Sequence, residues 1–196
     1  IREKAVSLAW HDSDRPAEER LRVMRAALKD PAAIVRKVTL QDTIYMGFAS
    51  RDPLAELFIT VLRDETDPDL RAMAASRIGR LTFPSVDSVS NRMITAMADA
   101  LVSTVQNDRD PQVRAASGHA FLRLSHWLAS KDHGPNLAKQ RKTLDALIDR
   151  EQDERVTTIL SDAQQSSDRR LLEEFKWGED PEPAPSDPAS PSPSPS

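Results

Sequence analysis

The chain has 196 residues, with 27 Lys or Arg, 31 Asp or Glu, 5% aromatic residues and only five glycines. This length favours one domain or one run of repeats, and a composition poor in aromatics and turn glycines favours packed helices over a β-sandwich. There is no cysteine, which excludes disulfides, thiolate catalysis and Cys-based zinc sites, and no apolar run approaches the roughly 18 residues of a membrane span.

The charge is distributed unevenly along the chain. Residues 178–196 hold four of the 31 acids and no base, so 27 acids face 27 bases in residues 1–177. A body without net charge has little of the phosphate-neutralising charge that supports general nucleic-acid binding. The sequence therefore makes nucleic acid an unfavourable partner for the body.

In chain order, the first pattern is a short step, Ile1-Arg2, followed by small and apolar residues at Ala5, Leu8 and Ala9. It looks like the second helix of a helical hairpin whose first helix is missing. We therefore expect residues 1–166 to form a repeat array that is truncated at its N-terminal end, with an N-terminal continuation of the same chain.

Amphipathic stretches then alternate with a recurring step. The stretches cover about 16–29, 53–63, 85–106 and 136–150, and each predicts the first helix of a hairpin. Between them lie segments that open with Asp-Pro and reach an apolar residue followed by Arg, at Arg36, Arg71 and Arg114. Asp can cap a helix N-terminus, and Pro is tolerated at the first helical position. Each segment therefore predicts a second helix.

The Arg of each step marks one position, here called the anchor. The anchors are residues 2, 36, 71, 114 and, with Thr in place of Arg, 157. The anchors are 34, 35, 43 and 43 residues apart. Self-similarity at such spacings is typical of stacked helical repeats, in which each hairpin buries its apolar face against its neighbours.

The segments 67–81 and 110–124 resemble the second helices of HEAT repeats. The resemblance covers roughly residues 1–166 and implies an all-α fold, a right-handed α-solenoid of four to five HEAT-type helical hairpins. The sequence departs from the family pattern at Arg77, where Ala is usual, and in the longer last two repeats. Insertions are expected at 83–85 and 130–136.

The resemblance also implies a structural ladder in which the anchor Arg pairs with the Asp of the turn. Residues Asp67 and Arg71, and likewise Asp110 and Arg114, fit this pairing four residues apart. Arg36 is the corresponding anchor of the preceding repeat. A structural role is favoured over a binding role for these residues.

The C-terminal part differs in composition. Residues 167–177 predict a capping helix, with Leu171, Leu172 and Phe175 against the last hairpin. Residues 178–196 hold seven of the fourteen prolines and end in a Ser-Pro alternation without apolar residues. We expect this segment to be a disordered, acidic Pro/Ser-rich tail.

Patterns of catalytic or metal chemistry are weak. His119, His126 and His133 are seven residues apart, a spacing of about 10 Å on a helix that is too long for one shared ion. No Gly-x-Ser-x-Gly turn or phosphate-binding glycine loop occurs. We expect no catalytic residues, cofactor or metal, although an enzyme remains a third, less favoured interpretation.

Two columns of residues on the second helices are candidates for partner binding. Five residues past the anchor lie Gln41 and His119, and nine past it lie Tyr45, Arg80 and Arg123. Residues four apart are neighbours on a helix face, and Tyr and Arg are enriched among residues that dominate interfaces. A solvated face is the alternative for any one of them.

The sequence therefore favours a non-catalytic protein–protein interaction scaffold, a module that binds a protein partner or joins an assembly. The alternative is a nucleic-acid-binding or DNA-repair module of HEAT-like repeats, to which Trp10, Trp127 and Trp177 could contribute, although packing explains them as well. The compartment is not fixed by the sequence, and the cytoplasm is favoured.

Overall fold

A computed structural model describes residues 16–42, 50–81, 89–129 and 136–165 of the chain, without the side chains of His126, Trp127, Ala129 and Gln165. In these ranges it contains eight α-helices and no strand, so the all-α prediction is confirmed. Several predicted features lie outside the described residues. They are the half-hairpin at residues 1–9, Tyr45, the insertion at 83–85, nearly all of the insertion at 130–136, the capping helix and the tail.

One helix of each pair follows the predicted amphipathic stretch. These helices are α2 (Ala17–Ala27), α4 (Asp52–Asp64), α6 (Asn91–Asn107) and α8 (Ala138–Ile148). In α4 the buried residues Leu54, Phe58, Val61 and Leu62 recur at helical spacing, which places one apolar stripe toward the interior.

The other helix of each pair carries the anchor position. These helices are α3 (Ala33–Asp42), α5 (Pro68–Arg80), α7 (Pro111–Ala129) and α9 (Glu154–Gln165). Proline begins α5 and α7 as predicted, whereas α3 begins two residues after Pro31. No helix among the described residues is long and apolar enough to cross a membrane.

Aspartates hold the N-terminal ends of these second helices. Asp67 Oδ1 accepts a hydrogen bond from the Asp69 amide at 2.9 Å, and Asp110 Oδ1 accepts one from Gln112 at 2.8 Å. An N-cap of this kind satisfies a backbone donor that has no partner inside the helix, and its loss costs about 1 kcal/mol. The predicted capping role of the Asp-Pro step is therefore confirmed at both turns.

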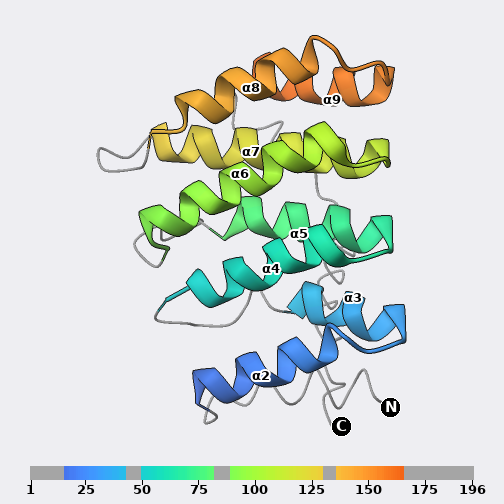
Figure 1. Cartoon of the computed structure of the whole chain (residues 1–196), viewed down its shortest axis with the longest axis vertical. Coiled ribbons are helices and arrows are strands. Elements are labelled where there is room, and N and C mark those ends of the chain that lie inside the picture. Colours follow the sequence, from blue (N-terminus) through green and yellow to red (C-terminus); the bar gives the residue numbers. More distant parts are fainter. Residues whose placement is uncertain (1–15, 43–49, 82–88, 130–135, 166–196) are drawn as a thin grey trace, which may run out of the picture.

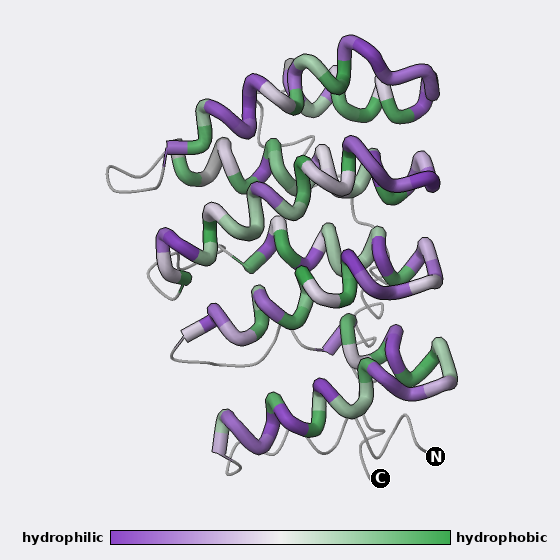
Figure 2. Tube along the Cα trace, in the orientation of Figure 1, coloured by the Kyte–Doolittle hydropathy of each residue, from purple (hydrophilic) through white to green (hydrophobic). Residues whose placement is uncertain are grey.

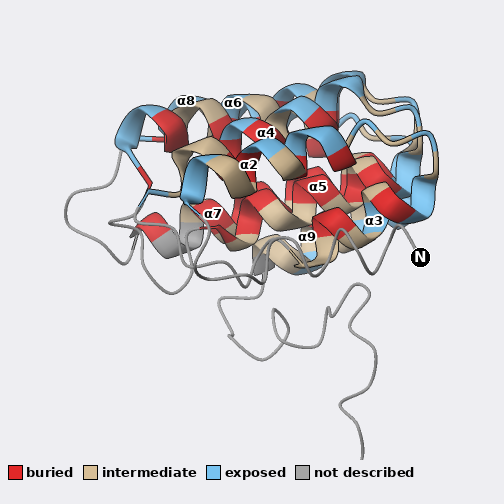
Figure 3. Cartoon of the chain, turned by 90° about the horizontal axis from the view of Figure 1, so that it is seen from below, coloured by how far each residue is buried: buried red, intermediate tan, exposed pale blue. Residues whose placement is uncertain are grey.

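The helices form two stacked layers. α2, α4, α6 and α8 make one layer, and α3, α5, α7 and α9 make the other (Figure 1). Each helix packs against its pair partner and against the next helix of its own layer. Figure 3 shows the buried residues concentrated where the two layers meet, and Figure 2 shows hydrophilic residues at the turns that join the two helices of each pair.

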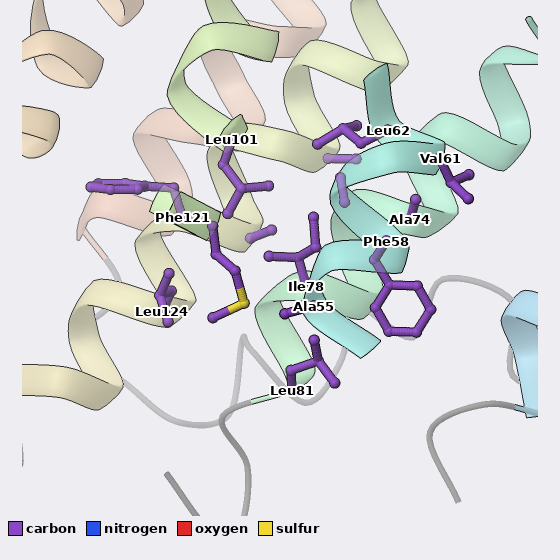
Figure 4. Packing of buried hydrophobic residues seen from close by; sticks show 14 of the residues in the cluster. Ala55, Phe58, Val61, Leu62, Ala74, Ile78, Leu81, Leu101, Phe121 and Leu124 are labelled. Atoms are coloured by element: carbon purple, nitrogen blue, oxygen red, sulfur yellow. The ribbon is translucent and has the colours of Figure 1, made fainter. Parts of the chain in front are cut away.

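The core runs continuously through the stack. Phe58 of α4, Ile78 of α5, Leu101 of α6 and Phe121 of α7 are all fully buried (Figure 4). Burial of one such side chain contributes about 1.5–3 kcal/mol. Each pair therefore depends on its neighbours for the burial of its apolar surface.

Small residues allow the helices of the second layer to approach closely. A Cβ atom added to Gly79 of α5 would lie 3.0 Å from both Cα and Cβ of Ala120 in α7. A Cβ atom added to Gly118 would lie 2.5 Å from Leu160 Cδ2 in α9. These contacts fix the distance between consecutive second helices, and hence the geometry of the surface that they present.

Candidate functional site: a groove across three helices

The edge of the stack that contains the helix-pair turns is held by anchor arginines. Arg71 Nε donates to Asp108 Oδ2 at 2.8 Å, and Arg71 Nη2 donates to Asp108 Oδ1 at 2.9 Å. Its Nη1 donates to the backbone carbonyls of Glu65 and Thr66 at 3.2 and 3.0 Å. One guanidinium thus binds its own turn and the turn of the next helix pair.

The same arrangement occurs three times. Arg36 binds Glu65 at 2.7 and 3.2 Å, and Arg114 binds Glu151 at 2.8 and 2.9 Å, in both cases through Nε and Nη2. We call the pairs Arg36–Glu65, Arg71–Asp108 and Arg114–Glu151 the arginine clamps. Each side chain in them is less than 20% exposed, and a bidentate guanidinium–carboxylate pair in such surroundings is geometrically specific.

The clamps correct the pairing expected from the resemblance. Arg71 and Arg114 bind Asp108 and Glu151 of the following turn, in place of Asp67 and Asp110. The reason is that the carboxylates of Asp67 and Asp110 cap the helices that they precede. The acid of each clamp lies six residues before the anchor of its own repeat, as Glu65, Asp108 and Glu151 all do.

The clamp acids also order their own turns. Glu65 Oε1 accepts hydrogen bonds from the amides of Thr66 and Asp67, and Glu151 Oε1 accepts them from Gln152 and Asp153. The hydrogen bond from Arg114, together with these amides, lowers the pKa of Glu151. Burial alone would raise the pKa values of Glu65 and Asp108, but amide and guanidinium hydrogen bonds outweigh it and lower both.

A groove of about 380 Å³ crosses the surface of the layer that contains the anchor helices, and it lies over α3, α5 and α7. Its lining next to the turns comes from Ile34 of α3, Asp69 of α5 and Gln112 of α7. These three residues lie two positions before their anchors, so the stack places them in one row. Ile34 is 47% exposed, and no other large hydrophobic residue among the described residues is exposed.

Apolar side chains, two of them alanines, make the middle of the groove. Ala72 and Met73 of α5 and Ala116 of α7 line it, with Lys37 of α3 at its side. Alanines here leave space that larger residues would fill, and neighbouring helices cannot close it because the core residues fix their spacing. The groove therefore follows from residue size at one register of the repeat.

The far row contains part of the predicted partner-binding set. Gln41, Ser76 and His119, each five residues past its anchor, all line the groove. The structure thus brings Gln41 and His119 to one surface. Arg80 and Arg123, one turn further along α5 and α7, are half-buried and do not line the groove, and Tyr45 lies outside the described residues.

His119 lies in a positive environment. Burial, and after it the charges of Arg123 and Arg80, together lower its pKa from 6.5 to about 4. Its imidazole is therefore neutral at pH 7. The two arginines thus act electrostatically on His119 at the edge of the groove.

The predicted partner-binding set did not contain Ile34, Lys37, Met73 and Arg77, which also line the groove. A signal was available for Ile34, which breaks a row that is otherwise polar. No group of three or more His, Asp or Glu side chains in the described part of the chain is placed to hold a metal ion.

Comparison of the chain with protein-family models, curated proteins and solved structures finds no match.

Proposed function

We propose that the chain is a non-catalytic protein–protein interaction scaffold whose groove holds a segment of a partner protein. In this proposal residues 1–166 form a right-handed α-solenoid of HEAT-type hairpins. The recurring anchor arginines, the capped second helices and the two-layer stacking support that assignment. Such a stack offers an extended surface made by successive repeats.

The exposure of Ile34 beside an apolar-floored groove carries the proposal. An exposed apolar side chain by itself is ordinary. Ile34, however, adjoins a preformed groove that is lined by Leu70, Met73 and Ala116, and this combination is typical of a binding surface. An apolar side chain of a partner can bury itself there against Ile34. The polar rows on either side can then fix its orientation.

A nucleic-acid partner receives less support from the same surface. That function needs Lys37, Arg80 and Arg123 clustered without acids. Lys37 instead shares the groove with Asp67 and Asp69, whose negative charges oppose a phosphate backbone.

The test compares two matched variants in affinity purification with mass spectrometry. Arg155 of α9 is exposed and holds the register position that Ile34 holds on α3, but it lies away from the groove. We expect Ile34→Asp to lose specific partner proteins that the parent chain and Arg155→Asp both retain, with unchanged helical circular dichroism. Retention of the same partners by Ile34→Asp would contradict the proposal.

A further inference from the structure

Among the described methionines, Met73 of α5 is the one whose side chain reaches the surface. It is half-buried and lines the middle of the groove. The other described methionines, Met24, Met93 and Met97, belong to the core and are at most 8% exposed. A reagent dissolved in water therefore meets the thioether of Met73 first.

The position of Met73 is apolar in all four anchor helices, but it holds sulfur in α5 alone. Met73 lies two residues past its anchor, as do Val38 of α3, Ala116 of α7 and Ile159 of α9. Those three side chains are hydrocarbons, which peroxides do not oxidise. The stacking of the helices thus requires an apolar residue at this position and does not require a thioether. The oxidisable side chain occurs where the groove is.

The groove admits a small oxidant to this side chain. Its volume of about 380 Å³ holds several water molecules, and hydrogen peroxide is only slightly larger than water. The sulfur lone pair attacks one peroxide oxygen, an S–O bond forms and the O–O bond breaks. Thioether and hydrogen peroxide thus give sulfoxide and water, with the sulfur oxidised and the peroxide reduced.

We propose that Met73 is a reversible oxidation site, at which a peroxide converts the thioether to the sulfoxide and so prevents the groove from binding its partner. This inference rests on the proposed function and adds a regulation of the same site. The sulfoxide oxygen is a polar group on a surface that Ile34 and Ala116 otherwise make apolar. Covering it with an apolar side chain of the partner is unfavourable, because the oxygen then loses its hydrogen bonds to water.

The reverse step is known chemistry for a methionine sulfoxide. A methionine sulfoxide reductase returns the thioether, while two thiols become one disulfide and the oxygen leaves as water. Oxidation at this site can therefore be undone without new synthesis of the chain.

The first measurement identifies the modified residue. The full-length chain is treated with dilute hydrogen peroxide, sampled over time, digested and analysed by mass spectrometry. We expect Met73 to gain one oxygen atom well before Met24, Met93 and Met97, while the helical circular dichroism stays unchanged. Oxidation of Met73 no faster than that of the three core methionines would overturn the inference.

The second measurement follows binding. The probes are fluorescent peptides, selected from a random phage library on the full-length chain and depleted on Ile34→Asp, and their dissociation constants are measured by anisotropy. We expect peroxide treatment to weaken binding about tenfold, as the loss of one buried apolar contact does. Methionine sulfoxide reductase should restore the affinity, and Met73→Gln should show the loss without peroxide.

Met73→Leu is the control, because Leu has nearly the volume of Met and no sulfur. It should bind the peptides as the parent chain does and keep that affinity after peroxide. Unchanged binding by the oxidised parent chain, or an equal loss in oxidised Met73→Leu, would overturn this inference and leave the proposed function standing. Failure to find any peptide that distinguishes Ile34→Asp from Arg155→Asp would overturn both.

Discussion

The turn edge and the groove use the repeat in opposite ways. At the turn edge, the same interaction recurs in three consecutive units, with Arg36, Arg71 and Arg114 each binding the acid of the next turn. Across the groove, equivalent positions carry unlike residues, as Ile34, Asp69 and Gln112 do.

The difference separates two tasks. An interaction that every unit repeats joins that unit to its neighbour, and it is structural. A position that varies from unit to unit gives the surface a local chemistry that the stacking does not require. The comparison therefore assigns stability to the clamps and recognition to the groove.

Acid should act on all three clamps together and so have the largest effect on stability. The pKa values of Glu65, Asp108 and Glu151 are lowered in the folded chain. A carboxyl group whose pKa is lower in the folded than in the unfolded chain stabilises the fold at pH values above its unfolded pKa, which is near 4. This contribution is lost as the pH falls through the folded pKa. Urea unfolding below pH 4 should show the loss.

The control for this titration is Asp108→Asn, which removes one titrating clamp acid. Its unfolding free energy should be lower at pH 7 and should fall less steeply in acid than that of the parent chain. Identical slopes below pH 4 would mean that the clamps do not carry the acid sensitivity.

Loss of one clamp should be the largest single-residue effect. Arg71→Ala leaves the Asp108 carboxylate largely buried without its cation, at a cost of about 3 kcal/mol. Arg63→Ala is the control, since the pair of Arg63 with Asp64 is exposed and should contribute little to stability. In double-mutant cycles by urea unfolding, Arg71 should couple to Asp108 and show little coupling to Asp67. The reverse result would restore the pairing expected from the sequence.

His119, which lines the groove, should give the stability of the fold a second dependence on pH. Its pKa of about 4 in the folded chain means that the unfolded chain binds the proton at a higher pH than the folded chain does. Stability should therefore decline as pH falls from about 6.5 toward 4, by on the order of 2 kcal/mol. His119→Gln should remove this decline but keep the steeper loss below pH 4. An unchanged profile would show that His119 is not the group that titrates.

A smaller effect is expected at Ser117. Its hydroxyl is fully buried and has no hydrogen-bond partner among the described residues, whereas Thr39 at the equivalent position donates to the Val35 carbonyl at 2.7 Å. Ala74 already occupies this position in α5. Ser117→Ala should stabilise the chain by up to about 1 kcal/mol, while Thr39→Ala should destabilise it. A loss of stability in Ser117→Ala, measured by thermal unfolding, would show that the hydroxyl is hydrogen-bonded.

The helices were predictable because their signals are local. Asp67 with Pro68, and Asp110 with Pro111, specify a cap and a first turn without reference to the rest of the chain. The clamp partner was not predictable from spacing alone, since Asp67 lies within reach of Arg71 in sequence but has its carboxylate engaged at the N-cap. A repeated acid six residues before each anchor was the signal for the correct partner.

The groove was predictable only in part. The column at Gln41 and His119 follows from the repeat period, and it does line the groove. The hollow itself depends on the sizes of Ala72 and Ala116 on two different helices. That is a tertiary property, and a single helix pattern does not contain it.

One side-by-side urea unfolding measurement tests the separation of tasks most directly. A groove variant with Ile34→Asp, Gln41→Ala and Ser76→Asp is compared with Arg71→Ala and with the parent chain. We expect the groove variant to unfold within about 0.5 kcal/mol of the parent, as surface substitutions do, and Arg71→Ala to lose about 3 kcal/mol. A groove variant that loses as much as Arg71→Ala would show that these side chains hold the stack together, and it would contradict the account.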